Sequence, residues 1–357
     1  MNETVPTIAI IIGVDTHKLT HAAAAISTLG VRLGTMTIPV SGTGYQALEA
    51  WAQSLGSVQA FGVEGTGSYG AGLSRFLCES GHAVLEVNRP NRQLRYQKGK
   101  NDPLDAESAA RAVLSGEATA LPKAGTGSVE MIRHLKVARD TAVKGRTQAM
   151  QTLKAIIVIS PLVLREQLDR LTGKMALIRH LAALRPGPLT STTASAKTAL
   201  RAIARRWLAL DEEIKGNDAH LEALTVARAP ELMQAHGMGA GTAAEMLLLV
   251  GDNPERIRSE AAFAKLCGVC PIPASSGKTN RHRLNRGGNR QANAALYRVV
   301  ITRVRGHRPT LDYMQRRTAE GKSKLEIIRC LKRYVAREVF GYLCAAPKPA
   351  NTSSRAA

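Results

Sequence analysis

The chain has 357 residues, 44% of them hydrophobic, so it is long enough to bury a substantial core and to form two or three domains. Its 49 Lys and Arg residues outnumber 28 Asp and Glu residues, and the net charge of +21 indicates a polyanionic partner, with nucleic acid as the first expectation. Five scattered cysteines exclude a disulfide-rich scaffold. The apolar N-terminal run stops at Asp15, which argues against a signal peptide and a membrane span, so we expect a cytoplasmic protein.

The first part of the chain alternates strand-like and helix-like segments. Apolar and β-branched runs predict strands, which are expected at residues 8–14, 20–27, 31–40, 58–64 and 82–88. Helices are expected near residues 43–55, 68–80 and 103–115. This order predicts an α/β domain with a mixed sheet over residues 1–125.

Residues 126–225 have a different pattern, rich in Ala, Leu, Arg and Lys. The apolar positions of residues 131–159 recur at three- and four-residue spacing, and the helical sequence is interrupted only by residues 185–198. We expect two long antiparallel helices that form a coiled-coil arm. An ordinary helical bundle packed on the core is the alternative.

Residues 226–345 predict a third, mainly helical domain, and the Pro-, Ser- and Ala-rich tail 346–357 predicts disorder. The glycines of residues 235–247 indicate a turn that opens a helix and presents backbone N–H groups to a phosphate, or simply a tight helix–helix turn. Cys267 and Cys270 form a CxxC pair without further ligands at zinc spacing, so we expect small core residues there.

The positive charge is concentrated near the C-terminus. Residues 1–125 hold ten basic and ten acidic side chains, whereas residues 278–337 hold seventeen basic and three acidic ones. We expect phosphate contacts, which position a nucleic acid without reading its sequence, from this basic segment. The residues expected to make them are Lys278, Arg281, Arg283, Arg286, Arg290 and Arg298. A basic surface that only keeps the protein solvated is the alternative.

Four acidic residues lie where strand ends and a helix start are predicted. Asp15 and Glu64 end predicted strands, and Asp102 and Asp105 share one face at the start of a predicted helix. Strand ends open on one edge of an α/β sheet, so the carboxylates can converge there and bind Mg²⁺, which prefers oxygen ligands. Two such ions support in-line phosphoryl transfer. The alternatives are structural: Asp102 before Pro103 as a helix N-cap, and Asp15 as a turn residue.

The stretch PASSGKTNRHRLNRGGNRQAN, residues 273–293, contains a candidate nucleophile. A phosphate-binding loop is excluded because position 272 is Ile rather than Gly, and no Gly-x-Ser-x-Gly element surrounds Ser276. Ser276 precedes Gly277, which permits close backbone approach, and a basic segment follows. Such a serine could attack a phosphodiester and hold the DNA end covalently, or it could be an ordinary loop residue.

Taken together, these motifs resemble transposases of the IS110 family. Asp15, Glu64 and the Asp102-x-x-Asp105 pair resemble the acidic set of the family's RuvC-like (RNase H-like) N-terminal domain. Residues 268–300 resemble its C-terminal transposase domain, in which a Ser-Gly step precedes a basic, glycine-containing segment. The resemblance covers residues 8–345 in the right order.

The resemblance implies a DNA recombinase of an insertion sequence, active in the bacterial cytosol or nucleoid. Asp15, Glu64, Asp102 and Asp105 would bind Mg²⁺, for which Mn²⁺ can substitute, and Ser276 would be the nucleophile, with Ser275 as the neighbouring alternative. The implied partners are donor and target DNA, a noncoding bridge RNA that pairs with both, and further copies of the chain in a dimer or tetramer. The helical arm would serve that assembly.

Two other functions remain open at this point. A RuvC-like, structure-selective DNA endonuclease would use the same acids with metal-activated water in place of serine. A nucleic-acid-binding protein without enzymatic activity would use the acids only as structural caps.

Overall fold

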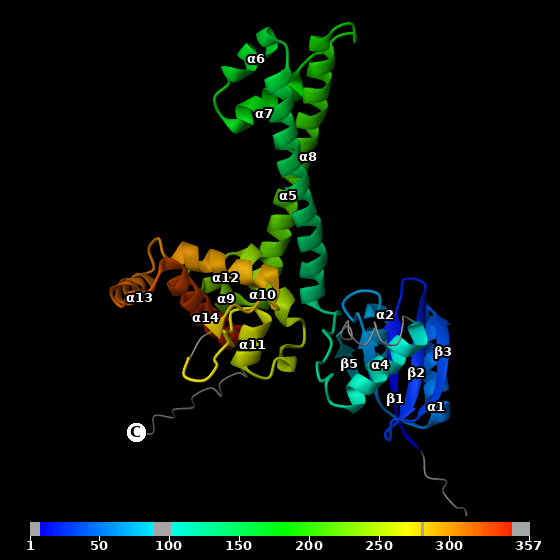
Figure 1. Ribbon diagram of the computed structural model, residues 1–357. Helices are drawn as coiled ribbons and strands as arrows, with labels where there is room; N and C mark the ends of the chain where they lie inside the picture. Colours follow the sequence, from blue (N-terminus) through cyan, green and yellow to red (C-terminus); the bar gives the residue numbers. More distant parts are fainter. Residues whose placement is uncertain (1–7, 89–100, 280–281, 345–357) are drawn as a thin grey trace, which may run out of the picture. The chain divides into compact units, whose positions relative to one another are not determined.

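The computed structural model describes residues 8–88, 101–279 and 282–344. The chain divides into two compact units (Figure 1). The first comprises Met1–Gly127 with Gly251–Arg258, and the second comprises Ser128–Val250 with Ser259–Ala357. The sequence-based division at residues 125, 225 and 345 stays a prediction. Among the described residues, no helix has the length and apolar content needed to cross a bilayer.

The first unit contains a five-stranded mixed sheet in the order β3-β2-β1-β4-β5. Its strands are β1 Ala9–Thr16, β2 Thr20–Ser27, β3 Arg32–Pro39, β4 Ser57–Glu64 and β5 Val84–Val87. β1 pairs with β4, and β4 with β5, in parallel, whereas β2 is antiparallel to both of its neighbours. The predicted mixed sheet is therefore confirmed, with each expected strand present.

Among the residues that the structure describes, three helices cover the two faces of this sheet. They are α1 Gly42–Leu55, α2 Ala71–Glu79 and α4 Asp102–Leu114. The side chains of a strand alternate between faces, so Ile10, Ile12 and Val14 of β1 pack in one cluster with Leu48 of α1 and Leu73 of α2. The intervening Ile11 packs in a different cluster with Ala110 of α4. α4 therefore lies on the face opposite α1 and α2.

The second unit begins with a long helical hairpin. α5 Ser128–Ile159 and α8 Thr192–Arg228 pack along each other, and the short helices α6 Leu162–Asp169 and α7 Lys174–Ala183 lie between them in sequence (Figure 1). Arg139 Nε donates to Asp218 Oδ1 at 2.8 Å, and Arg146 pairs with Asp211. Seven residues forward along α5 thus correspond to seven residues back along α8, so the helices are antiparallel as expected. A coiled-coil arm stays a prediction.

The expectation of a single interruption at residues 185–198 is wrong. Pro161 ends the first helical run, because proline lacks an N–H group and restricts the preceding residue, and Gly173 has φ +95°, a conformation that favours glycine. α6 and α7 instead pack beside α5 and α8 around a cluster that includes Leu153 and Trp207. α8 already begins at Thr192, where the Ser191 side chain accepts from Ala194 N at 3.1 Å.

The rest of the second unit is mainly helical, as predicted. Its elements are α9 Pro230–Gln234, α10 Ala240–Val250, α11 Glu260–Leu266, the short strands β6 Ile272–Pro273 and β7 His282–Arg283, α12 Arg290–Arg303, α13 Arg308–Ala319 and α14 Lys324–Leu343. The 3₁₀ helix η1 Pro254–Arg256 belongs to the first unit. The glycine-containing turn opens α10 at Ala240 as expected, and its binding of phosphate stays a prediction.

The two cysteines of the CxxC pair differ in burial. Cys267 is fully buried, and burial raises the pKa of its thiol to about 12. Cys270 is only partly buried, so the expectation of two core cysteines is correct for Cys267 alone. The tail, residues 346–357, lies outside the described residues.

Candidate active site

Parallel strand ends bring two of the predicted acids together. Val14 of β1 lies opposite Val63 of β4, so Asp15 and Glu64 follow at adjacent positions on neighbouring strands. The hydroxyl of Thr16 donates to the backbone oxygen of Glu64 at 3.0 Å and ties the two strand ends together. Both acids are largely buried, with 6% of Asp15 and 7% of Glu64 exposed.

A close approach between α4 and β1 brings the other two acids to the same edge. A Cβ atom on Gly13 would lie 2.0 Å from the backbone oxygen of Ala106 and 2.3 Å from the backbone nitrogen of Ala110. Glycine therefore lets the backbone of α4 contact the strand directly, on the face that also carries Asp15. The first turn of α4 contains Asp102 and Asp105. Asp105 is 6% exposed.

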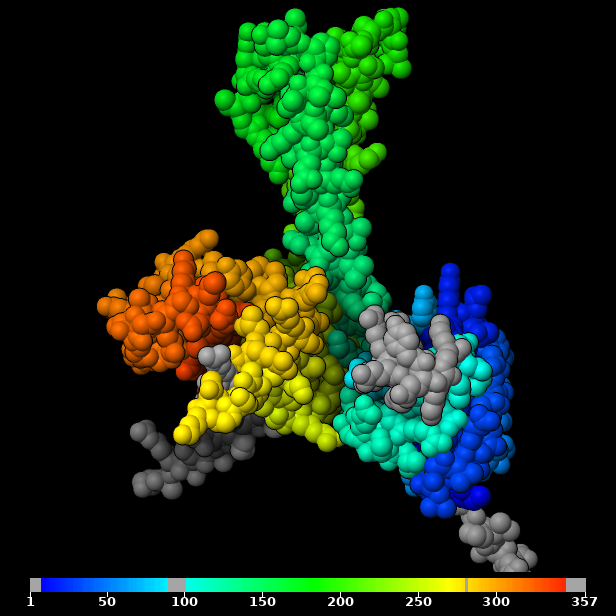
Figure 2. All heavy atoms as spheres, in the orientation of Figure 1, coloured from blue at the N-terminus to red at the C-terminus, as the bar shows by residue number. Residues whose placement is uncertain are grey.

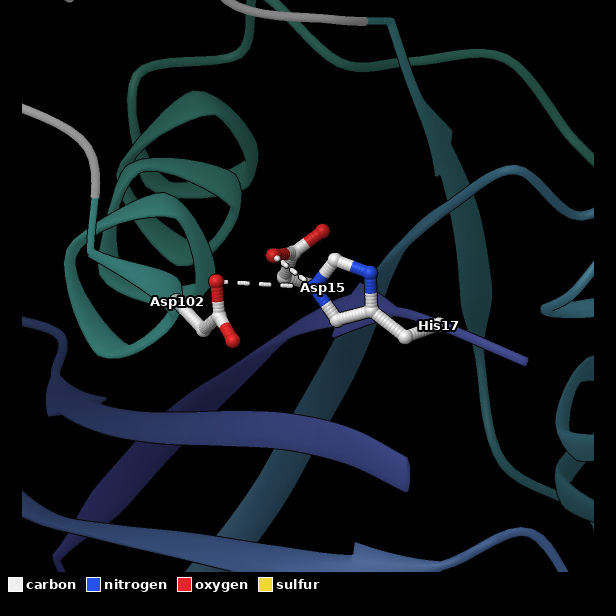
Figure 3. Close-up of side chains that lie close together, drawn as sticks. All are labelled: Asp15, His17 and Asp102. Carbon is white, nitrogen blue, oxygen red and sulfur yellow. Dashed lines mark ion pairs between the residues drawn. The ribbon is translucent and has the colours of Figure 1, made fainter. Parts of the chain in front are cut away.

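His17 joins this cluster and was not expected from the sequence. Its Nε2 lies 3.1 Å from Asp15 Oδ2 and 3.5 Å from Asp102 Oδ1, and the three side chains point toward one another from β1, the loop after it and α4 (Figure 3). One ligand atom from each side chain lies within 4.8 Å of the others, a spacing that could hold a metal ion. The available signal was the Asp-x-His spacing at a strand end, which places both side chains on one face.

The charge balance of the cluster favours a bound cation. Burial raises the pKa of Asp15, and the negative charges of Asp105 and Asp102 act in the same direction, while His17 opposes them. Several carboxylates held together in this way repel one another unless positive charge compensates. Carboxylate oxygens suit Mg²⁺ and Mn²⁺, so the donor set of this edge fits a divalent ion.

The acids line a cavity of about 530 Å³ in the first unit. Asp15, Glu64 and Asp105 contribute to its wall. Asp102 does not line the cavity itself but contacts His17, which does. The structure thus brings all four predicted acids to one edge. Asp102 is the first residue of α4, and Asn101 occupies the N-cap position, so the reading of Asp102 as the cap is wrong.

The cavity has further polar lining that sequence reasoning missed. Glu86 and Asn88 come from the end of β5, and Tyr69, which is 57% exposed, comes from the turn after β4. β5 runs parallel to β4, and Glu64 pairs with Val87, so its end opens at the same edge. The strand predicted over residues 82–88 already implied that its last residues could lie beside Glu64.

The serine candidates lie in the second unit, near the tip of a β-hairpin. Ser276 and Thr279 exchange backbone hydrogen bonds of 3.2 and 3.1 Å across Gly277 and Lys278. Gly277 has φ +55° at the first central position, as a type II′ turn requires. Ser275 and Ser276 are both exposed, and the hairpin, in yellow, projects from the surface (Figure 2).

The basic residues that follow the hairpin are available to a ligand. Five predicted contact residues are exposed and make no ion pair with a carboxylate of the residues that the structure describes: Lys278, Arg283, Arg286, Arg290 and Arg298. Arg281 lies outside the described residues. Gly288 packs against Gly268, since a Cβ atom there would lie 2.2 Å from the Gly268 nitrogen, and this contact anchors the base of the basic loop.

Comparison with known proteins finds matches for both the region with the four acids and the region with the serine candidates. A family model described as a transposase, for the DEDD type of IS110, matches residues 12–159, and the model of the transposase IS116/IS110/IS902 family matches residues 229–315. An insertion element IS110 uncharacterized 43.6 kDa protein of Streptomyces coelicolor is 28% identical over 144 residues. The match covers 40% of this chain and 35% of that protein, so it spans about a third of the relative's length. With the acidic cluster inside the first match and Ser276 inside the second, the chain belongs to the IS116/IS110/IS902 family of transposases.

Proposed function

We propose that the protein is a site-specific DNA recombinase of an insertion sequence, which cuts and rejoins DNA through a covalent link between DNA and Ser276. The observation that carries the proposal is the pairing of two matched regions in one chain. One holds four acids at a single sheet edge, and the other holds an exposed serine at a basic hairpin.

The proposed reaction is a reversible exchange of phosphodiester bonds. Ser276 Oγ loses its proton and forms a bond to the scissile phosphorus, while the bond from phosphorus to the deoxyribose oxygen breaks and that oxygen takes up a proton. Attack by a second deoxyribose hydroxyl on the seryl phosphodiester then releases the serine and joins the new strand. No bond energy is lost to water, so rejoining needs no external energy source.

Two groups of side chains would support this reaction, one by binding phosphate and the other by binding a metal ion. Arginines near the hairpin, among them Arg283 and Arg286, are suited to hold phosphate oxygens and to stabilise negative charge at the reacting phosphorus. Asp15, Glu64, Asp102 and Asp105 would hold Mg²⁺ or Mn²⁺, with His17 as a further ligand. When bound, the ion polarises a phosphoryl oxygen.

The proposal includes the expected partners. Donor and target DNA follow from the reaction, and a bridge RNA that pairs with both is supported by the family and by the net charge of +21, which suits two polyanions. A dimer or tetramer formed through the α5–α8 hairpin completes the proposal. In such an assembly the serine and the acids can come from one subunit or from two.

A covalent adduct tests the central step. Wild-type protein incubated with nicked or suicide DNA substrates and Mg²⁺ is expected to form a denaturation-resistant protein–DNA complex, which Ser276→Ala abolishes and Ser275→Ala retains. Peptide mapping of the adduct identifies the linked residue. If the Ser275→Ala, Ser276→Ala double variant still recombines DNA, the serine mechanism is excluded.

A structure-selective endonuclease is the second candidate, and the acidic cluster favours it independently of the serine. It predicts cleavage of branched DNA by the Ser275→Ala, Ser276→Ala variant, with water as the nucleophile and no covalent adduct. If the protein only binds nucleic acid, neither the wild type nor Asp102→Asn should break DNA, so the substitution should make no difference in a cleavage assay.

A further inference from the structure

A strongly basic cleft lies in the second unit, next to the hairpin that bears Ser276. It has a volume of about 690 Å³ and is lined by the loop after α11, by β7 and by α13 and α14. Eight of the nineteen described residues that line it are Lys or Arg, with His282 in addition, whereas Glu326 is the single acidic one. The cleft residues on α13 and α14 lie in the basic segment 278–337, but none of them is among the six phosphate-contact residues expected from the sequence.

Much of this positive charge lacks compensation inside the protein. Arg283, Arg316 and Arg329 make no ion pair with any carboxylate in the part of the chain that the structure describes. Glu326 accepts hydrogen bonds from the backbone and hydroxyl of Ser323 and serves as part of a capping box. The cleft therefore presents a positive potential to solvent.

Burial and a neighbouring positive charge lower the pKa of two basic side chains in the cleft, Lys332 and Arg333. Burial lowers the pKa of Lys332, and the neighbouring Arg329 lowers it further. Burial likewise lowers the pKa of Arg333, with Arg337 acting in the same direction. Glu260 pairs with Arg333 and lies 3.9 Å from Arg337, whereas Arg329 and Lys332 have no such carboxylate among the described residues. An anion in the cleft would relieve the repulsion between these two cations.

Aromatic rings accompany the charges. Tyr313 and Tyr334 make an edge-to-face contact with centroids 5.4 Å apart, and Tyr334 remains 51% exposed. Arg316 lies 5.4 Å from the ring centroid of Tyr313, and Arg337 lies 5.8 Å from that of Tyr334. An exposed ring beside several cations is the combination that binds a nucleobase and its phosphates together.

We infer that this cleft binds a segment of unpaired DNA, with a base stacked on Tyr334 and phosphates held by Arg316 and Arg329. The bases of a duplex are already stacked on one another, so a base reaches a tyrosine ring only where the strand is unpaired. The assignment to DNA depends on the proposed function: His282 and Arg283 belong both to the cleft wall and to the hairpin of Ser276. The bound segment would be the strand that leads to the attacked phosphodiester.

The test is a binding measurement on the full chain in EDTA, so that no chemistry contributes. The probes are a single-stranded deoxyoligonucleotide containing 2-aminopurine, its duplex, and an oligoribonucleotide of the same sequence. The wild-type protein is expected to quench 2-aminopurine in the single strand by stacking. Tyr334→Leu should lose this quenching and bind about 5- to 150-fold more weakly, whereas Tyr334→Phe should retain both properties.

Matched controls separate stacking and charge from general damage. Tyr342 lies on the same helix, is 40% exposed and does not line the cleft, so Tyr342→Leu should bind as the wild type does. Arg329→Gln should reduce the slope of log K against log salt by about 0.7, whereas Arg206→Gln, an exposed arginine on α8, should not.

Each outcome bears on the inference. Unchanged quenching in Tyr334→Leu, an unchanged salt slope in Arg329→Gln, or tighter binding of the duplex or the RNA would overturn it. Loss of the covalent adduct in Ser276→Ala is a separate measurement. A protein that fails that test and still stacks DNA on Tyr334 would contradict the proposed function and leave the cleft as a DNA site.

Discussion

At the scale of single residues, the sheet edge that carries Asp15, Glu64, Asp102 and Asp105 holds several carboxylates whose negative charges repel one another. Asp15, Glu64 and Asp105 are each less than a tenth exposed, and burial together with neighbouring carboxylates raises the pKa of Asp15. A divalent cation that binds this site in the folded chain and not in the unfolded one would stabilise the fold.

We therefore expect Mg²⁺ or Mn²⁺ to raise the melting temperature of the wild-type protein by an amount that grows with ion concentration. At a concentration one hundred times the dissociation constant, the stabilisation is about 2.7 kcal/mol. Asp105→Asn should remove most of this effect and abolish DNA cleavage. Glu107→Gln, on the same helix but paired with Arg111, is the matched control and should keep the ion-dependent shift. An equal shift in Asp105→Asn measured by calorimetry would contradict the metal assignment.

His21 gives a prediction of pH dependence away from the acids. Its ring is fully buried, stacks parallel to Tyr45 and lies with Nδ1 3.1 Å from the Thr20 backbone oxygen, and burial lowers its pKa. A lowered pKa in the folded state means that neutral His21 contributes stability above the unfolded-state value of about 6.5. That contribution is lost as the pH falls through the folded-state pKa.

The free energy of unfolding, measured with urea in EDTA, should thus fall more steeply between pH 7 and pH 5 in the wild type than in His21→Phe. Phenylalanine keeps a ring against Tyr45 but cannot be protonated. Each unit by which the pKa is lowered corresponds to about 1.4 kcal/mol of difference. The lowered pKa of His307 affects both proteins equally and cancels. Parallel pH profiles for the two proteins would contradict the assignment.

At the scale of elements, the site depends on how closely α4 packs on the sheet. Gly13 permits the contact, and the atoms that an added Cβ would meet are backbone atoms, which cannot rotate away. The first turn of α4 carries two of the four acids, so the packing of one helix sets the geometry of the whole cluster.

Gly13→Ala is expected to destabilise the protein by about 3 kcal/mol, the upper part of the range for overpacking, and to reduce cleavage by displacing Asp102 and Asp105. Gly67→Ala, in the turn beside the cavity, is the control because its Cβ would meet nothing within 4 Å. Urea denaturation and a cleavage assay check both effects. A Gly13→Ala protein with wild-type stability would show that α4 does not pack as described.

The helices and strands also show where a local sequence pattern was sufficient to predict the structure and where it was not. The strands of the first unit follow from β-branched and alternating runs bounded by turns, and Asp102 with Asp105 follow from their three-residue spacing. α6 and α7 were missed, because a continuous Ala- and Leu-rich composition hides breaks that depend on Pro161 and Gly173. The cleft between α13 and α14 was missed for another reason: its residues come from segments that are separate in sequence.

At the scale of the whole molecule, charge and assembly become the relevant properties. The net charge of +21 is concentrated in the second unit, where the hairpin and the basic cleft lie. The helical hairpin of the same unit ends in apolar side chains that remain exposed: Val158 at 59%, Ile159 at 81%, Leu162 at 68% and Val163 at 70%. Exposed apolar groups in this number are typical of an interaction surface.

If the α5–α8 hairpin serves assembly, charge at its end should dissociate the oligomer. Ile159→Lys combined with Leu162→Glu is expected to shift the protein to a smaller species in sedimentation velocity, without changing its helical circular dichroism. Leu29→Glu changes an apolar residue that is 90% exposed in the first unit and should leave the sedimentation coefficient unchanged. An unaltered distribution for the double variant would place the assembly interface elsewhere.

The sequence by itself determined the alternation of strands and helices in the first unit, the helical character of the second, the four acids, the serine candidates and the excess of positive charge. These properties depend on side-chain type and short-range periodicity, which are written locally in the chain. Only the tertiary structure decided that His17, Glu86 and Asn88 join the acids, and that Tyr334 shares a cleft with Arg283, Arg316 and Arg329. Such neighbourhoods arise when strand register, a glycine contact and helix packing bring distant segments together. A local pattern can place a side chain at the end of a strand, but it does not specify which distant side chains lie beside it.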